Sequence, residues 1–172
     1  LQTIGIPIHS IAPSSIEEKK REAESPMEYC TRLALEKGFV QENCVVLTAD
    51  TIVTMNETVF EKPQNDAHAF SILRQLSGNW HEVITAWSLQ APSNRLHGHS
   101  ISKVLFRSLS DVEIKAYIRT KEGADKAGSY GIQGKGAALV EEIQGSYSNI
   151  VGLPLAEVLD GLRRFGVTPE YA

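Results

Sequence analysis

The stretch that decides the fold runs from Cys44 to Pro63. It begins Cys-Val-Val-Leu-Thr-Ala-Asp-Thr-Ile-Val, passes through a short polar turn, and ends Phe-Glu-Lys-Pro. The apolar run predicts a strand that carries a carboxylate, Asp50, and a connection of hairpin length then leads to a lysine, Lys62. A carboxylate beside a strand end is a suitable ligand for a hard metal ion, and a nearby lysine suits phosphate. The stretch points to phosphate chemistry, although an aspartate that only caps a turn would give the same local pattern.

Length, charge and composition bound the class of protein. The 172 residues are 42% hydrophobic with a net charge of −4, which is typical of one ordinary domain with its own core. Lysine and arginine are scattered rather than clustered, so we expect no nucleic-acid partner. No apolar run approaches the roughly 20 residues that span a bilayer, so we expect no membrane partner and a cytoplasmic location. Cys30 and Cys44 have neither metal-site nor redox spacing, and we expect both to be buried free thiols.

The spacing of apolar residues predicts alternating helices and strands in a single α/β domain over residues 1–172. The expected strands are 6–11, 44–47 with its continuation 51–55, 80–89, 101–106 and 137–140, with a loop over 91–98. The expected helices begin at the Ser25–Glu28 capping box, at the cap Asn65 and at the Ser110–Glu113 capping box, and a last helix covers 154–165. Because hairpin-length and crossover connections both occur, we expect a mixed sheet flanked by helices.

Several polar residues have two interpretations. Lys37 extends the apolar face of its helix, so its ammonium either reaches solvent along the surface or points into a cleft above the sheet. The pair Glu17–Glu18 lies in a charged stretch, which by itself is typical of a solvated surface. His97 and His99 lie in a polar segment, and we expect them to be solvated rather than to bind zinc.

The segment 125–136 is rich in glycine, with four glycines among the nine residues from Gly128 to Gly136. Glycines let backbone amides approach a ligand closely. The side-chain amide of Gln133 has a donor and an acceptor that can pair with the edge of a base. The alternative is a flexible surface loop. The segment is not a dinucleotide fingerprint, because no helix is predicted to follow it.

Five stretches, in this order along the chain, resemble the Maf family, also called septum-formation-inhibitor-like proteins, which act as nucleoside triphosphate pyrophosphatases. They are Ala49–Val53, Glu61–Pro63, Leu76–Gly78, Asp125–Gly134 and Val151–Leu155. The resemblance implies a Maf/inosine-triphosphatase-like fold and a homodimer. It also implies cleavage between the α- and β-phosphates, which gives a nucleoside monophosphate and pyrophosphate.

The resemblance implies roles for individual charged residues. Asp50 matches the catalytic aspartate of the family, and Lys62 matches the lysine that follows the next turn. Lys37 matches the lysine at the end of the first long helix. Glu18 matches an acid of the family, although Glu17 is an alternative counterpart. A divalent metal ion (Mg²⁺, Mn²⁺ or Co²⁺) is the implied cofactor, with Glu18 and Asp50 as its ligands.

Two further positions concern the choice of substrate. The sequences Ala-Asp-Thr and Tyr-Gly-Ile-Gln-Gly resemble those of the subgroup that hydrolyses dTTP and UTP, with modified pyrimidine nucleotides as further candidates. Thr51 and Gln133 are then the base-selecting residues, and the 7-methyl-GTP subgroup differs at these positions.

One part of the family pattern is missing from the sequence. The family begins with a strand and a Ser-x-Ser-x-Arg-Arg loop that binds the triphosphate, and both would precede Leu1. We therefore expect a domain that lacks its first strand and phosphate loop, with Leu1–Gly5 as the end of a helix. The alternative function is an inactive Maf-like protein that binds regulatory partners in septum formation or division arrest.

Overall fold

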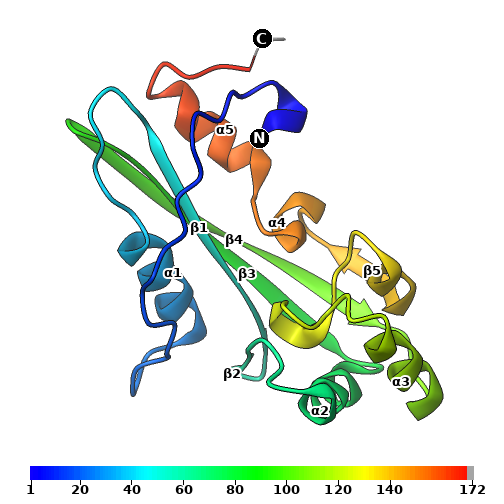
Figure 1. Cartoon of the computed structure of the whole chain (residues 1–172). Coiled ribbons are helices and arrows are strands. Elements are labelled where there is room, and N and C mark those ends of the chain that lie inside the picture. Colours follow the sequence, from blue (N-terminus) through cyan, green and yellow to red (C-terminus); the bar gives the residue numbers. More distant parts are fainter. Residues whose placement is uncertain (170–172) are drawn as a thin grey trace.

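A long antiparallel sheet runs through the molecule, which we describe from a computed structural model over residues 1–169 (Figure 1). The sheet has five strands in the order β2-β1-β3-β4-β5. The strands are β1 (Val46–Met55), β2 (Thr58–Phe60), β3 (Trp80–Ala91), β4 (Asn94–Phe106) and β5 (Val140–Gln144). With its helices, the sheet forms the expected single α/β domain.

The expectation of a mixed sheet is wrong, because every strand pairing in residues 1–169 is antiparallel. Strand β2 folds back from the end of β1, and α2 (Asp66–Leu76) then returns the chain to that same end. As a result β3 starts beside the end of β1, where Glu82 pairs with Thr54, and the two strands run in opposite directions. A helix in the connection therefore did not require parallel pairing.

The helices begin where the capping signals predicted. The side chain of Ser25 caps α1 (Pro26–Glu36) in a complete capping box, and Ser110 does the same for α3 (Asp111–Arg119). Asn65 caps α2 by accepting a hydrogen bond from the His68 N–H at 2.9 Å. The remaining helices are α4 (Tyr147–Val151), α5 (Leu155–Arg163) and three short 3₁₀ helices, Gln2–Ile4, Ala127–Ser129 and Lys135–Leu139. No helix within residues 1–169 is both long enough and apolar enough to cross a membrane.

Two sequence predictions at the ends of strands are wrong. Residues 6–11 form no strand. Pro7 has no N–H to give to a strand pairing, and Ile6 instead packs in the apolar cluster beside α5. Residues 94–98 are part of β4 rather than a loop, because the connection from β3 is a turn of only Pro92 and Ser93.

The sequence-based assignment of elements also needs two corrections toward the carboxyl end. Residues 137–139 belong to a 3₁₀ helix, and the expected strand starts only at Val140. The short helix α4 was not predicted, although Ser146 caps it.

Of the two cysteines, Cys30 is a buried free thiol as expected, but Cys44 is only half-buried.

Helix α1 covers one face of the sheet. Its residues Cys30, Leu33 and Ala34 pack against Ile52 and the neighbouring strand β3. Two hydrogen bonds fix α1 on β1, from Thr48 Oγ1 to the Ala34 carbonyl at 2.7 Å and from Cys30 Sγ to the Asp50 carbonyl at 3.2 Å. The carboxyl end of α1 is thereby held beside the middle of β1.

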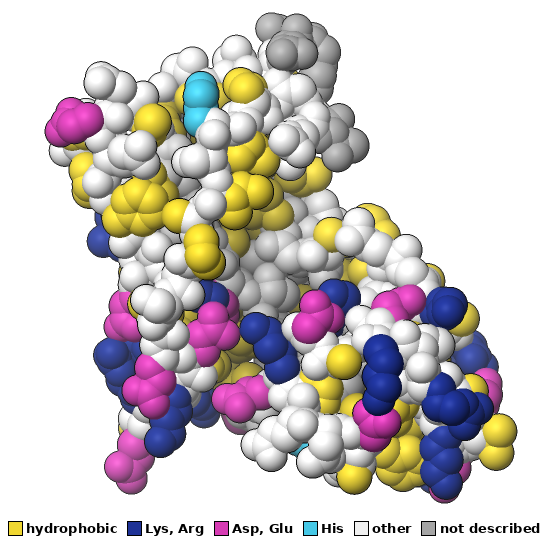
Figure 2. Space-filling model, viewed as in Figure 1, with side chains coloured by type: hydrophobic (Ala, Val, Ile, Leu, Met, Phe, Trp, Pro, Cys, Tyr) yellow, Lys and Arg dark blue, Asp and Glu magenta, His cyan; other side chains and the backbone are white. Residues whose placement is uncertain are grey.

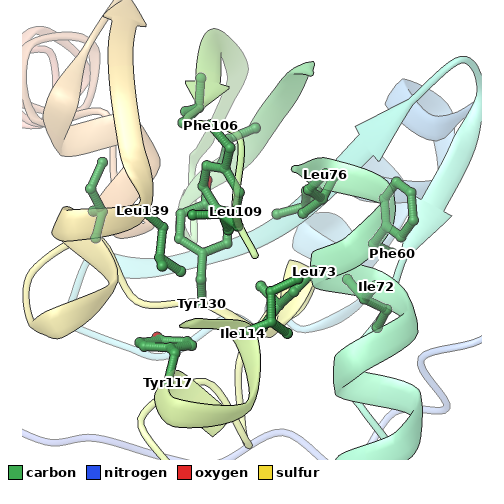
Figure 3. Packing of buried hydrophobic residues seen from close by; sticks show 14 of the residues in the cluster. Phe60, Ile72, Leu73, Leu76, Phe106, Leu109, Ile114, Tyr117, Tyr130 and Leu139 are labelled. Carbon is green, nitrogen blue, oxygen red and sulfur yellow. The ribbon is translucent and has the colours of Figure 1, made fainter. Parts of the chain in front are cut away.

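The larger core lies on the opposite face of the sheet. It joins β1, β3 and β4 to α2, α3 and the glycine-rich segment, as Figure 3 shows for residues such as Leu73, Ile114 and Tyr130. The Tyr130 ring packs edge-on against Phe106, with 4.8 Å between ring centroids. This packing fixes the start of the glycine-rich segment on the sheet.

We expect Ile114→Ala to lower the free energy of unfolding by about 2–5 kcal/mol, because Ile114 is fully buried between α2 and α3. Val112 lies on the same helix and is 74% exposed, so Val112→Ala is the matched control and should change stability by no more than about 0.5 kcal/mol. Urea unfolding of both variants is the measurement. Equal losses in the two variants would contradict the assigned packing of α3.

Candidate active site

The four charged residues singled out from the sequence lie in one row of ion pairs. Lys37 Nζ contacts Asp50 Oδ1 and lies 2.6 Å from Glu18 Oε1. Lys62 Nζ lies 3.8 Å from Glu18 Oε2. Glu17 is not part of this row or of the cleft beside it, so of the two alternatives Glu18 is the acid that the fold brings to Asp50.

The position of Lys37 follows from the way α1 packs. Lys37 is the C-cap of α1, one turn after the buried Leu33, so the helix that packs on the sheet also aims this side chain at β1. A cation is favourable here because the end of a helix carries partial negative charge. The side chain of Lys37 is only 16% exposed. Of the two interpretations, its ammonium therefore points into the cleft rather than out to solvent.

Lys62 reaches the same row of ion pairs from the segment that follows β2, the strand at the edge of the sheet next to β1. The short strand β2 pairs with β1 only over Val53–Met55, and the buried ring of Phe60 fixes its end. Lys62 follows two residues later with 64% of its side chain exposed. Its ammonium is therefore free to approach a ligand in the cleft.

Burial and pairing give the charged groups different pKa values. Burial raises the pKa of Asp50, and the ammonium of Lys37 opposes this effect. Burial acts to lower the pKa of Lys37, but its contacts with Asp50 and Glu18 outweigh it and raise that pKa. The hydrogen bond from Lys37 lowers the pKa of Glu18. Burial thus favours proton uptake by Asp50, pairing opposes it at Glu18, and Lys37 stays charged.

A cleft of about 730 Å³ opens beside the ion pairs, a volume typical of small-molecule sites. Glu18, Lys37, Asp50 and Lys62 line one side of it, and the glycine-rich segment with Gln133 lines the other. Figure 2 shows acidic and basic side chains gathered around the hollow in the lower half of this face.

Thr51 lies in the cleft with its hydroxyl proton already committed. Thr85 Oγ1 donates its single proton to the Asn149 carbonyl at 3.0 Å. The Thr51 hydroxyl then has its one proton for Thr85 Oγ1 at 2.9 Å or for the Gly152 carbonyl at 3.4 Å. The Thr51 oxygen therefore offers only an acceptor to a ligand in the cleft.

Gln133 directly follows two buried residues, Gly131 and Ile132, while its own side chain is exposed to the cleft. Within residues 1–169 its amide makes no hydrogen bond that would occupy it. The fold therefore brings both predicted base-selecting residues to the cleft that holds Asp50.

A family model for Maf-like proteins matches residues 1–165. The chain belongs to the Maf-like family. It is 44% identical over 170 residues to the dTTP/UTP pyrophosphatase of Salmonella typhimurium, a match that covers 96% of this chain and 86% of the relative. It is 42% identical over 175 residues to the dTTP/UTP pyrophosphatase of Escherichia coli, covering 99% and 88%. It is 41% identical over 165 residues to the dTTP/UTP pyrophosphatase of Alcanivorax borkumensis, a match that covers 93% of this chain and 86% of the relative.

The acids of this Maf-like chain suit a divalent cation. Among residues 1–169, no three His, Cys, Asp or Glu side chains come together as a metal site. Glu18 and Asp50 nevertheless offer carboxylate oxygens on either side of Lys37, and Mg²⁺ commonly takes one or two carboxylates and completes its shell with water and phosphate oxygens. The donor set therefore fits a cation that shares its ligands with a bound triphosphate.

An arginine that the sequence analysis missed holds the segment with Glu18. Arg32, on α1, donates from Nε to Glu24 Oε1 at 2.6 Å and from Nη2 to the Lys19 carbonyl at 2.9 Å. Its Nη1 lies 3.0 Å from Glu36 Oε2. The only local signal was the spacing of four residues between Arg32 and Glu36.

The same contacts act on Glu24. The hydrogen bond from Arg32 lowers the pKa of Glu24 to about 2. A lowered pKa means that the pair stabilises the fold above the ordinary pKa of a glutamate and that this contribution is lost as the pH falls toward 2. At neutral pH the pair is therefore intact and fixes the backbone next to Glu18.

Three other residues of the cleft were not predicted. Tyr29, Glu122 and Lys126 all line it. Burial raises the pKa of Tyr29 to about 12, so its hydroxyl stays protonated and can donate to a ligand. Tyr29 precedes Leu33 by one helical turn, and this spacing on the apolar stripe was the signal that could have found it.

We expect Arg32→Gln to make trypsin cleave the stretch Lys19–Arg21 roughly fivefold faster or more, because local stability of about 1 kcal/mol is lost with the clamp. Mass spectrometry of the early fragments identifies the cleavage sites. Arg163→Gln removes an exposed ion pair on α5 and is the control. An unchanged cleavage rate in Arg32→Gln would show that the segment is held by something else.

Proposed function

We propose that this chain hydrolyses dTTP and UTP to the nucleoside monophosphate and pyrophosphate. The observation that carries the proposal is the largely buried side chain of Asp50. It pairs with Lys37, which also pairs with Glu18, in a cleft whose other wall presents an unoccupied amide. The names of the similar enzymes from Salmonella typhimurium and Escherichia coli support the choice of substrate. A homodimer that works without nucleic acid is part of the same proposal.

Asp50 is the proposed general base. Lys37 contacts only one of its carboxylate oxygens, so the other oxygen can hold a water molecule. The pKa of Asp50, raised by burial, favours proton transfer from that water. The water oxygen then bonds to the α-phosphorus while the bond from this phosphorus to the α,β-bridging oxygen breaks. Asp50 takes the proton, and pyrophosphate leaves with the electron pair of the broken bond.

Lysines and a cation balance the charge of the substrate. A triphosphate carries up to four negative charges, and these increase on the leaving group as the bond breaks. The ammonium of Lys62 is exposed beside the cleft, and that of Lys37 can exchange part of its contact with Glu18 for a phosphate oxygen. A divalent cation such as Mg²⁺, Mn²⁺ or Co²⁺, held by Glu18 and Asp50, would neutralise phosphate charge and acidify water.

Thr51 supports a preference for thymine and uracil over cytosine. Its oxygen offers an acceptor only, because its proton is donated to Thr85 Oγ1 or to the Gly152 carbonyl. Thymine and uracil carry an N–H at ring position 3, whereas cytosine carries an acceptor there. The amide of Gln133 has both a donor and an acceptor and can pair with a neighbouring carbonyl oxygen of the base. Together, Thr51 and Gln133 would favour the two bases with the ring N–H.

We expect Asp50→Asn to lower kcat for dTTP by roughly 10²–10⁴-fold, because an amide cannot accept the proton of the attacking water. Pyrophosphate release with Mg²⁺, Mn²⁺ or Co²⁺ is the measurement, and circular dichroism checks the fold. Asp160→Asn, at an exposed position of α5, is the control. Substantial turnover by a folded Asp50→Asn protein would remove Asp50 from the proposed role. A wild-type protein that binds nucleotides but releases no pyrophosphate would favour the alternative of a binding protein.

We expect Thr51→Val to reduce the preference for dTTP and UTP over CTP by about fivefold to tenfold, the value of one hydrogen bond. The ratio of kcat/KM values across the three nucleotides is the measurement. Thr54→Val is the matched control, since Thr54 lies on the same strand with its hydroxyl bonded to the Thr58 carbonyl and does not line the cleft. If Thr51→Val lowers all three values equally, Thr51 does not read the base.

A further inference from the structure

Glu122 lies beneath the glycine-rich segment and accepts hydrogen bonds from its backbone. Its Oε2 accepts from the Lys135 N–H at 2.8 Å, and its Oε1 accepts from the Gly136 N–H at 2.7 Å. The hydroxyl of Tyr117 donates to the same Oε1 at 3.1 Å. The two carboxylate oxygens are thus both used to hold one short stretch of chain.

Tyr117 extends this arrangement to the other side of Gln133. Its hydroxyl oxygen accepts a hydrogen bond from the Gly131 N–H at 3.0 Å. The contacts therefore fix the backbone two residues before Gln133 and again two and three residues after it. We call Glu122 and Tyr117, with the backbone N–H groups that they bind, the loop clasp.

The glycines of the segment allow the clasp to form. A Cβ at Gly134 would lie 2.4 Å from Glu122 Oε2, and a Cβ at Gly136 would lie 2.4 Å from the Gly131 carbonyl oxygen. A side chain at Gly134 would push the backbone away from the carboxylate, and one at Gly136 would push it away from Gly131. Close packing with Glu122 thus explains the glycine at 134, and close packing with the Gly131 backbone explains the glycine at 136.

The clasp holds Gln133 without touching its side chain. The side chain of Gln133 stays free and faces the cleft, while the backbone on both sides of it is fixed. Burial acts to raise the pKa of Glu122, but the N–H groups of Gly136 and Lys135 outweigh it and lower that pKa, so the carboxylate is ionised at neutral pH. Hydrogen bonds to an ionised acceptor are stronger than those between neutral groups.

We propose that Glu122 is a positioning residue that sets the place and orientation of the Gln133 amide against the base, an inference that rests on the proposed function. A loop that is fixed before the substrate arrives loses less conformational freedom on binding. Glu122 acts through the backbone of the loop and takes no part in the transfer of a proton or a phosphoryl group.

The test compares Glu122→Gln with the wild-type protein. An amide has one oxygen, so its NH₂ group would face a backbone N–H and one of the two contacts must be lost. We expect KM for dTTP to rise on the order of tenfold with kcat within about twofold, and the preference over CTP to fall. Backbone amide exchange measured by NMR should become faster at Lys135 and Gly136. Glu141→Gln, at an exposed position of β5, is the control.

Two further variants keep the test decisive. Tyr117→Phe keeps the buried ring and removes the hydroxyl that binds the Gly131 N–H and donates to Glu122 Oε1. The two backbone contacts of Glu122 remain, so a smaller change of KM and ranking in the same direction is expected. Gln133→Leu should change the nucleotide ranking as Glu122→Gln does, and combining the two should add little. If Glu122→Gln lowers kcat while KM and the ranking stay unchanged, the positioning role is overturned. The same holds if it only lowers stability.

The outcome can be separated from failure of the proposed function. If the wild-type protein releases no pyrophosphate from any nucleotide, the proposed activity fails. Calorimetric titration with a dTTP analogue that carries a methylene group between the α- and β-phosphorus then decides the role of Glu122. Weaker binding by Glu122→Gln than by Glu141→Gln supports the positioning role, and equal binding, or no binding by any of these proteins, overturns it.

Discussion

Burial of the Asp50 carboxylate is the constraint on which the rest of the structure depends. A carboxylate that is 9% exposed is costly in a folded protein unless a positive group lies against it. Lys37 supplies that group because α1 packs its apolar face on β1 and ends at the level of Asp50. Helix α1 therefore covers the sheet with Cys30, Leu33 and Ala34, and it also places the ammonium of Lys37 against the carboxylate of Asp50.

The short length of β2 turns this ion pair into an accessible site. Strand β2 pairs with β1 only from Val53 onward, so the edge of β1 at Asp50 and Thr51 is not covered by it. Neighbouring side chains on a strand point to opposite faces of the sheet. Asp50 therefore points to the α1 side, with the charged row, and Thr51 points to the side of Thr85 and the glycine-rich segment. A cleft that wraps around this edge reaches both faces, which separates the groups suited to phosphate chemistry from those suited to base recognition.

Features that depend on residues close together in the sequence were predicted correctly. The caps Ser25, Asn65 and Ser110 were correct because a cap bonds within its own first turn. The order of Lys37, Asp50 and Lys62 was recognisable from the family resemblance, and the structure brings these side chains together. The direction of strand pairing was not predictable, because the same helix-containing connection can return a chain to either end of a strand. The amino-terminal part of β4 was missed because its inward-facing side has small residues, including Gly98, which lies against Trp87.

Contacts between distant residues explain why the supports of the site were missed. Arg32 binds the Lys19 carbonyl and Glu122 binds the Lys135 N–H, each across 13 residues of sequence. Neither pair has a spacing that a helix or strand pattern would reveal.

Arg32 and Glu122 stabilise their segments in the same way, by binding backbone groups that no helix or strand would pair. Glu18 and Gln133 both lie on segments outside helices and strands, where the backbone has few hydrogen bonds of its own. In each case a charged side chain binds the irregular backbone directly. Arg32, within α1, binds a carbonyl, and Glu122, shortly after the end of α3, binds N–H groups. A carbonyl needs a donor and an N–H needs an acceptor, so a cation serves the first segment and an anion serves the second. The signs of these two side chains therefore match the backbone groups that they hold, and the positive charge of Arg32 also matches its partners Glu24 and Glu36.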